Sequence, residues 1–178
     1  GLQELASGSM WAIISSAFAI CIFWFAVTFL ERPFGILTNA WLLELSQSDH
    51  PLLRELCLSA PGTYAHSIMV GNLAETGAEA IGANSLFCRV ASYYHDVGKM
   101  RRPHCFIENQ HGDNIHTRLN PSLSALIIAS HVKDGMDLAA EHKLPHQIAA
   151  IIQEHHGTSL IRYFYNQALA TYGEDRHD

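Results

Sequence analysis

The sequence lacks three things: paired cysteines, an excess of basic charge, and any charged residue in one long stretch near its start. Its four cysteines are scattered and form no CxxC pair. This argues against a structural zinc site and indicates reduced cysteines, in a core or a membrane, in a reducing compartment. The 11 Lys and Arg against 17 Asp and Glu give a formal charge of -6. With no basic field, the chain is not expected to bind duplex nucleic acid.

The third scarcity is the absence of any charged residue from position 10 to position 30. At ~1.5 Å of rise per residue, a helix of this length spans about the 30 Å hydrocarbon core of a bilayer. A buried core helix is the alternative, but in so small a domain such a helix rarely lacks a polar face. No basic segment or cleavage site indicates a signal peptide. We therefore expect a transmembrane helix at residues 10–32, preceded by a loop or cloning remnant at residues 1–9.

Histidine is present in excess, with twelve in 178 residues. One of them forms the pair His95-Asp96, which is followed by Gly98 and Lys99. Two metal-binding side chains and one phosphate-binding cation therefore fall within one turn of backbone. We expect Gly98 to end the preceding helix, because glycine accepts the left-handed conformation of a helix stop. A His-Asp dipeptide is common by chance, so its context decides its meaning.

Further histidines lie at or near the ends of other predicted helices, namely His66, His131 and the doublet His155-His156. Helical bundles build metal centres in their interiors from side chains on facing helices. Imidazole and carboxylate ligands together suit Fe, Mn or Zn. A lone histidine in this position would more often be a core or capping residue. The other histidines and Asp96 make His66 a ligand candidate.

Cap and turn residues divide the rest of the chain into short helices. After a connector at residues 33–50, we expect helices at 52–58, 63–81, 85–96, 122–130, 136–142, 147–156 and 159–172. Thr63, Asn84 and Asn120 are the expected N-caps of three of them. Residues 133–135 are expected to form a turn, and residues 173–178 a charged tail. The predicted fold class is all-α, a helical bundle preceded by one transmembrane helix.

Residues 103–119 show no helical periodicity and are rich in His, Asn and Gly. A loop this long is often functional, and we expect it to form a lid or rim over the site. Its histidines, His104, His111 and His116, are expected to be exposed or near substrate rather than ligands.

A short basic run, Lys99, Arg101 and Arg102, lies just before this loop. It suits a solvated helix C-terminus, because cations there complement the helix dipole. It also suits a phosphate-binding edge, for which Lys99 is the stronger candidate.

Five separate stretches resemble the HD-domain metal-dependent phosphohydrolases, and more closely the seven-transmembrane HD proteins of bacteria. They are APGTYAHS (60–67), YYHDVGKM (93–100), FIENQ (106–110), SLSALII (122–128) and EHHGTSL (154–160). The resemblance covers about residues 10–172 and implies a cytoplasmic HD domain at residues 51–172. It makes residues 10–32 the last helix of a polytopic region in the inner membrane of a bacterium. The implied activity is hydrolysis of cyclic di-AMP to the linear dinucleotide pApA.

The resemblance also implies a ligand set for two divalent transition metal ions, Fe or Mn. One ion would be held by His66, His95 and Asp96. Asp96 would bridge to a second ion, whose other ligands would be His131, His155 and His156.

In the implied mechanism, hydroxide formed between the two ions attacks phosphorus, and Lys99 neutralises charge that grows on the phosphoryl oxygens. Arg101, Arg102 and the loop residue Asn109 would position the second phosphate or a base.

The family pattern adds one more Asp on a helix beyond the region corresponding to residue 172. Neither Asp175 nor Asp178 matches it. We therefore expect one metal site to be incomplete in this sequence, and the chain to be part of a longer protein. Two alternatives stay open: a degenerate HD domain that binds a ligand or partner at the membrane, and an HD hydrolase of another nucleotide. The sequence leaves open the base, the metal, and whether the domain forms a homodimer.

Overall fold

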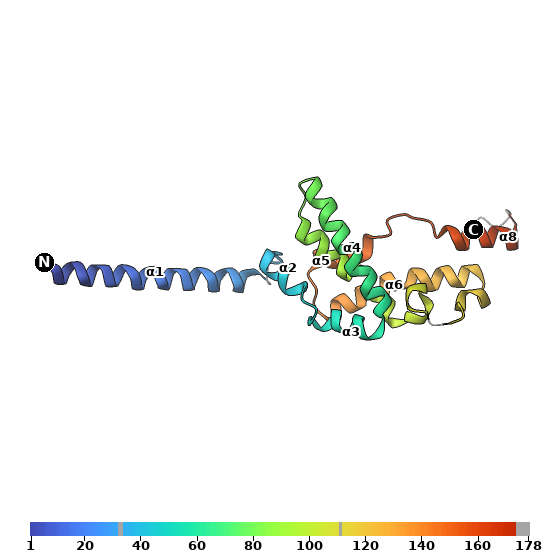
Figure 1. The fold of residues 1–178 in the computed structure, drawn as a ribbon, viewed down its shortest axis with the longest axis horizontal. Helices are drawn as coiled ribbons and strands as arrows, with labels where there is room; N and C mark the ends of the chain where they lie inside the picture. Colours follow the sequence, from blue (N-terminus) through green and yellow to red (C-terminus); the bar gives the residue numbers. More distant parts are fainter. Residues whose placement is uncertain (32–33, 111, 174–178) are drawn as a thin grey trace. The chain divides into compact units, whose positions relative to one another are not determined.

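The computed structural model describes residues 1–31, 34–110 and 112–173 (Figure 1). These residues form α-helices and short 3-10 helices, with no strand among them, which confirms the all-α prediction. The chain divides into two compact units, Gly1–Thr38 and Asn39–Asp178. Arg32, Pro33 and His111 lie outside the described residues, as do residues 174–178 of the predicted tail.

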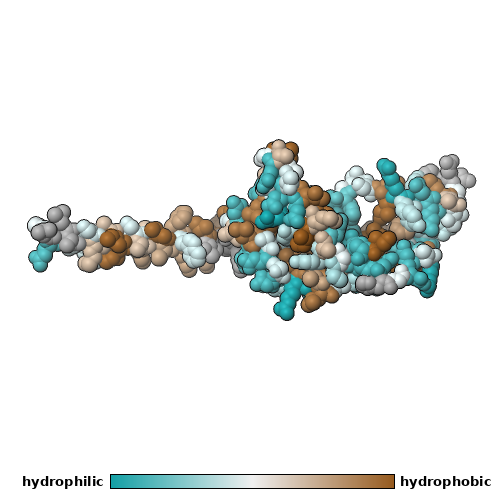
Figure 2. All heavy atoms as spheres, in the orientation of Figure 1, coloured by the Kyte–Doolittle hydropathy of each residue, from teal (hydrophilic) through white to brown (hydrophobic). Residues whose placement is uncertain are grey.

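The first unit contains one long helix, α1 (Leu2–Glu31). It begins at Leu2, so most of residues 1–9, for which we expect a loop, are helical. Its segment Ser7–Val27 is long and apolar enough to cross a membrane, by length and composition only, and none of it is buried. Figure 2 shows the apolar side chains along this helix.

The second unit is a bundle of short helices. Its α-helices are α2 (Asn39–Leu45), α3 (Pro51–Ser59), α4 (Pro61–Ala80), α5 (Ser85–Tyr94), α6 (Pro121–Glu141), α7 (His146–Glu154) and α8 (Arg162–Tyr172). The 3-10 helices are η1 (Val97–Arg101), η2 (Pro103–Cys105), η3 (Ile107–Asn109) and η4 (Ile115–Arg118). Helices α4 and α5 pack along each other, and α6 packs against η1, α7 and α8 (Figure 1).

Two of the predicted caps are present. The Asn84 side chain accepts a hydrogen bond from the backbone N–H of Phe87, and Asn120 accepts one from Leu123. Thr63 is not a cap, because α4 begins at Pro61 and Thr63 is buried inside its first turn.

The core of the bundle is aliphatic and includes part of the predicted connector. Leu42 and Leu45 of α2 are buried, and the buried Tyr94 hydroxyl donates to the Leu45 carbonyl over 2.7 Å. Residues 39–45 of the predicted connector therefore pack as part of the helical unit.

Helix α6 is continuous, whereas the sequence predicts two helices separated by a turn at residues 133–135. Gly135 lies within it, packed against the backbone of Gly98 and the side chain of Ile152. The ~1 kcal/mol that a glycine costs inside a helix is offset by this close packing.

Gly98 forms the other side of this contact. It does not end the preceding helix in a left-handed conformation, because it is not among the glycines with positive φ. A Cβ on Gly98 would lie 1.8 Å from the carbonyl oxygen of His131 and 2.5 Å from the Gly135 nitrogen. Only glycine therefore lets η1 lie against α6, and this contact brings Asp96 and His131 together.

Candidate metal centre

The six predicted ligands come from four parts of the bundle and meet in its interior. His66 lies on α4, His95 and Asp96 join α5 to η1, and His131 lies within α6. The doublet His155-His156 follows the last turn of α7, where Gly157 takes a φ of 54° and ends the helix. The ligand atoms form two groups, each within 4.8 Å: His66, His95 and Asp96, and His131, His155 and His156.

Three of these histidines share one orientation. The Nδ1 atoms of His95 and His155 lie 2.6 Å and 2.9 Å from the carbonyl oxygen three residues earlier in the chain, and His131 makes the same contact. A carbonyl only accepts, so each Nδ1 carries the proton. In a neutral ring the Nε2 atom then carries no proton, and its lone pair can bind a metal ion, as in metal-ligating histidines.

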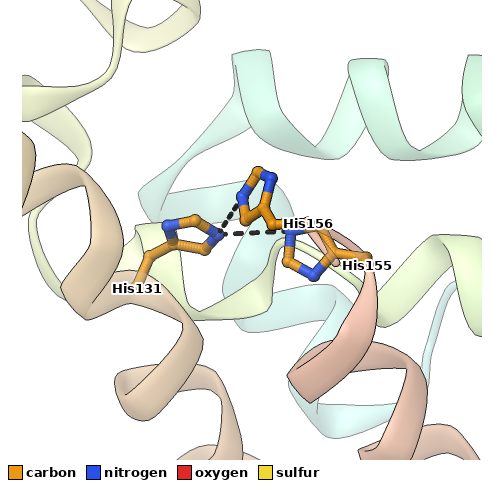
Figure 3. Close-up of side chains that lie close together, drawn as sticks. All are labelled: His131, His155 and His156. Carbon is orange, nitrogen blue, oxygen red and sulfur yellow. Dashed lines mark hydrogen bonds between the residues drawn. The ribbon is translucent and has the colours of Figure 1, made fainter. Parts of the chain in front are cut away.

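These Nε2 atoms converge in the second group. The Nε2 atom of His131 lies 3.3 Å from that of His155 and 3.2 Å from that of His156 (Figure 3). Burial lowers the pKa of His131 and of His156, which favours their neutral forms. The Nε2 atoms of His131 and His155, both unprotonated when Nδ1 carries the proton, repel each other at this distance. Nitrogen ligands ~2.1 Å from a shared cation lie about 3.0–3.4 Å apart, so this group fits a metal ion.

Asp96 faces both groups and is 3% exposed. Its Oδ2 atom lies 3.1 Å from His95 Nε2 and 3.9 Å from His66 Nε2. Its Oδ1 atom lies 3.4 Å from His131 Nε2 and 3.6 Å from His155 Nε2, and it has no hydrogen-bond partner. A buried carboxylate oxygen without a donor is costly, and a cation between it and the imidazoles would satisfy it.

Asp96 is ionised in this setting. Burial alone would raise its pKa, but His155, His95 and Lys99 together hold the pKa of Asp96 well below its ordinary value. The same contacts act on Lys99: burial alone would lower its pKa, whereas Asp96 and Glu108 raise it. The site therefore combines an anionic carboxylate with a charged ammonium.

Beside the second group lies a cavity of about 480 Å³, within the size range of ligand pockets. Lys99, His131 and His156 line it together with the aromatic rings of Phe106, Tyr163 and Phe164. Residues of the 103–119 loop complete the lining, as predicted for a rim. The cavity therefore combines an ammonium, imidazoles and the carboxylate of Glu108 with apolar surface.

Two predicted substrate residues are directed at α6 instead. Arg101 donates to both carboxylate oxygens of Glu141, at 3.1 Å and 3.0 Å. Arg102 donates to Ser130 at 2.9 Å and pairs with Asp134. Neither lines the cavity, so this geometry does not support their prediction as substrate residues. They pair with α6 because their long side chains reach the acceptors on that helix.

Asn109 also differs from its prediction. It is buried, its amide donates to Thr63 Oγ1 over 2.8 Å, and its oxygen accepts from the Thr63 backbone N–H over 3.1 Å. Both ends of the amide are occupied, so Asn109 fastens the loop to α4 and the geometry does not support substrate contact.

The loop histidines have different environments. His104 is exposed, as expected. His116 is buried, its Nε2 atom lies 2.8 Å from the Cys105 carbonyl oxygen, and its ring packs 5.3 Å from that of Phe164. Because His116 also lines the cavity, it is close to the site without belonging to either ligand group.

Sequence reasoning missed Glu108, whose Oε1 atom accepts from Lys99 over 2.8 Å. It also missed Phe106, over whose ring the Lys99 ammonium lies at 5.1 Å from the centroid. A signal for Glu108 exists: between Asp96 and Asp113 it is the only acidic residue, in a stretch that contains three Lys and Arg.

A helical bundle with two His/Asp groups that share one carboxylate is typical of a metal-dependent hydrolase of the HD class. The family model described as HD domain matches residues 63–177, and the chain belongs to that family. This confirms the broader part of the predicted resemblance.

Individual relatives are similar over most of this chain. It is 52% identical over 141 residues to the cyclic-di-AMP phosphodiesterase PgpH of Bacillus subtilis (strain 168), covering 79% of this chain and 20% of that protein. It is 50% identical over 146 residues to the protein of that name from Listeria monocytogenes serotype 1/2a (strain 10403S), covering 82% and 20%. The chain thus spans about a fifth of the length of these relatives.

A solved structure shows the same fold. The HD domain of the L. monocytogenes phosphodiesterase PgpH, in complex with cyclic-di-AMP, matches with a TM-score of 0.69 at 50% sequence identity. The match covers 72% of this chain and 61% of that one.

Proposed function

We propose that this chain is the HD unit of a phosphodiesterase that hydrolyses cyclic di-AMP to pApA. The observation that carries the proposal is Asp96, whose two oxygens face two ligand groups beside a cavity that Lys99 borders. The relatives named for this activity, and the related domain with cyclic-di-AMP bound, support the choice of substrate.

The donor set fits two divalent ions of iron or manganese, since imidazole and carboxylate suit both metals. His66 and His95 would hold one ion, His131 and the His155-His156 doublet the other, and Asp96 would serve both. When bound, such a pair lowers the pKa of water and neutralises phosphoryl charge.

The chain's own residues supply binding and orientation. An ammonium has three N–H donors, and Lys99 directs two of them to Asp96 and Glu108. One donor remains for a phosphoryl oxygen. The aromatic wall offers stacking surface to a base, which places the diester next to His131 and His156.

We also propose that α1 is a membrane anchor, the last of a polytopic region, that holds the HD unit on the cytoplasmic side of a bacterial inner membrane. Its uncharged, exposed run supports a membrane-spanning role for α1, and the side and the membrane are proposed from the resemblance. Light scattering of the detergent-solubilised protein would measure whether it forms a homodimer.

The test is metal content together with product formation. The chain is purified in detergent, loaded anaerobically with Fe²⁺ or with Mn²⁺, and assayed for bound metal and for pApA. We expect close to two ions per chain and hydrolysis of cyclic di-AMP once both metal sites are complete, and fewer ions and slower hydrolysis if the missing Asp leaves one site incomplete. A chimera that continues after Tyr172 with the matching segment of the B. subtilis relative tests whether the additional Asp is needed.

Two outcomes would favour the alternatives. Hydrolysis of cyclic di-GMP or pApA but not of cyclic di-AMP would indicate another nucleotide substrate. Cyclic di-AMP binding that survives metal removal, without hydrolysis by the chain or the chimera, would indicate a membrane-tethered binding module.

A further inference from the structure

The carboxylate of Glu108 is held in place from two sides. Its Oε1 atom accepts from Lys99 Nζ over 2.8 Å and from Thr63 Oγ1 over 3.1 Å. The neighbouring Asn109 makes two further hydrogen bonds to Thr63. A Cβ on Gly62 would lie 1.9 Å from the Glu108 carbonyl oxygen, so α4 and η3 are in direct backbone contact. The loop therefore presents this carboxylate to Lys99 from a fixed backbone.

Lys99 lies between two carboxylates. Its Nζ atom is 2.9 Å from Asp96 Oδ2 and 2.8 Å from Glu108 Oε1. The Asp96 oxygen that it contacts is the one that faces His66 and His95. The same atom is therefore a candidate metal ligand and the partner of a positively charged side chain.

A cation at this oxygen and the Lys99 ammonium would compete. Both are positive, and at separations of a few ångströms in a partly buried site their repulsion is substantial. If Asp96 were the only anion within reach, the ammonium would occupy its oxygen and weaken cation binding. Glu108 offers Lys99 another partner, one that belongs to neither ligand group.

We infer that Glu108 is a positioning residue: it gives Lys99 a second anionic partner, so that a metal ion can take the Asp96 oxygen while the ammonium stays at the cavity. The inference rests on the proposed function for the metal ions and the phosphodiester. It assigns Glu108 no direct contact with either; Glu108 acts through Lys99.

The test is a double-mutant cycle read by Mn²⁺ affinity, measured calorimetrically on metal-stripped protein. The proteins are the wild type, Glu108→Gln, Lys99→Met and the double variant. We expect Glu108→Gln to weaken Mn²⁺ binding about tenfold, a loss of about 1.4 kcal/mol. Lys99→Met and the double variant are expected to agree within about twofold, because without the ammonium Glu108 has nothing to position.

Glu141→Gln is the matched control. It removes one carboxylate that also pairs with a basic residue of η1, but on the exposed surface. It is expected to leave Mn²⁺ affinity unchanged. Melting temperature is followed for every variant, and Glu108→Asp, which keeps the charge but shortens the side chain, replaces Glu108→Gln if that variant fails to fold.

Two results would overturn the inference. If Glu108→Gln weakens Mn²⁺ binding equally with and without Lys99, the carboxylate acts through its own charge. If Glu108→Gln does not weaken Mn²⁺ binding at all, the Glu108 carboxylate is not needed to position Lys99 beside Asp96.

Turnover distinguishes this inference from the proposed function. For cyclic di-AMP we expect Glu108→Gln to lower kcat about tenfold while KM changes less than threefold. If neither the wild type nor the chimera hydrolyses cyclic di-AMP, the proposed function fails, and the Mn²⁺ cycle still decides the role of Glu108.

Discussion

The two ligand groups differ in exposure and in their neighbours. The His66 side chain is 41% exposed, whereas that of His131 is 1% exposed. The first group has a charged ammonium, Lys99, against its carboxylate. The second has three imidazoles in contact, two of them oriented by backbone carbonyls. His156 of the second group is nevertheless exposed and Asp96 of the first is buried, so the groups differ chiefly in how they are organised. Contacts between three imidazoles arrange the second group before any cation arrives, whereas ion pairs with Asp96 arrange the first.

This difference predicts an order of binding. A preorganised site loses less entropy when it binds, so the group of His131, His155 and His156 is expected to take the first cation. The group of His66, His95 and Asp96 would take the second, with its affinity set by the balance of Asp96, Lys99 and Glu108. Asp96 faces both ligand groups, so its removal is expected to weaken the binding of both ions and to abolish the order in which they bind.

The largest expected effect therefore comes from Asp96→Asn. The amide is nearly isosteric but neutral, so both groups lose their shared anion. We expect less than one bound ion per chain and a fall in turnover of at least about a thousandfold, equivalent to about 4 kcal/mol of transition-state stabilisation. Elemental analysis and the pApA assay measure the two effects, and a variant that keeps both ions and its rate would contradict the shared-ligand arrangement.

The pair His131→Ala and His66→Ala tests the two groups separately. His131 is enclosed, so its truncation leaves a cavity and is expected to cost roughly 2–4 kcal/mol of unfolding free energy as well as the first-binding ion. His66 is partly exposed, so His66→Ala is expected to weaken only the second ion and to change unfolding by less than about 1 kcal/mol. Denaturant unfolding and stepwise Mn²⁺ titration give both quantities. Equal losses in the two variants would mean that the groups do not differ in preorganisation.

Gly98→Ala tests the contact that joins the groups. Its added Cβ would collide with the backbone carbonyl of His131, which cannot move aside as a flexible side chain can. We expect a loss of roughly 2–3 kcal/mol in unfolding free energy and weaker metal binding at both groups.

Gly77→Ala is the matched control for this substitution. Gly77 lies in α4, and a Cβ there would meet nothing within 4 Å. The variant should be unchanged or stabilised by up to about 1 kcal/mol. A similarly mild effect at Gly98 would show that η1 and α6 do not need this close contact.

The sequence predicts the all-α class and most helices, because these depend on local patterns: Asn84 and Asn120 as caps, Gly157 after the histidine doublet. The resemblance predicts the six candidate ligands, which the structure brings close together. It does not predict the continuity of α6, because Gly135 is a helix breaker by composition and is tolerated only through its contact with Gly98.

The same limit applies around the cavity. Arg101 and Arg102 form a basic run in sequence, but which way they point depends on acceptors about 30–40 residues later in the chain. Glu108 and Thr63 lie 45 residues apart, and their meeting depends on the backbone contact at Gly62. Residue type indicates the ligands, whereas the groups that position them are set by long-range packing.

The smallest expected effect is on acid stability, and it concerns the Glu108–Lys99 contact beside the first group. Burial alone would raise the pKa of Glu108, but its hydrogen bonds with Lys99 and Thr63 lower it below the ordinary value of 4.5. As pH falls, Glu108 is therefore protonated at a higher pH in the unfolded chain than in the folded chain. The pair stabilises the fold above about pH 4.5, and this contribution is lost as pH falls through the folded pKa.

Metal-free Glu108→Gln should therefore lose less unfolding free energy between pH 7 and pH 3.5 than the wild type, by about 1 kcal/mol or less. Lys99→Met should lose less in the same way, since it removes the main donor. Equal losses in all three proteins would show that the Glu108–Lys99 contact contributes no stability to the fold.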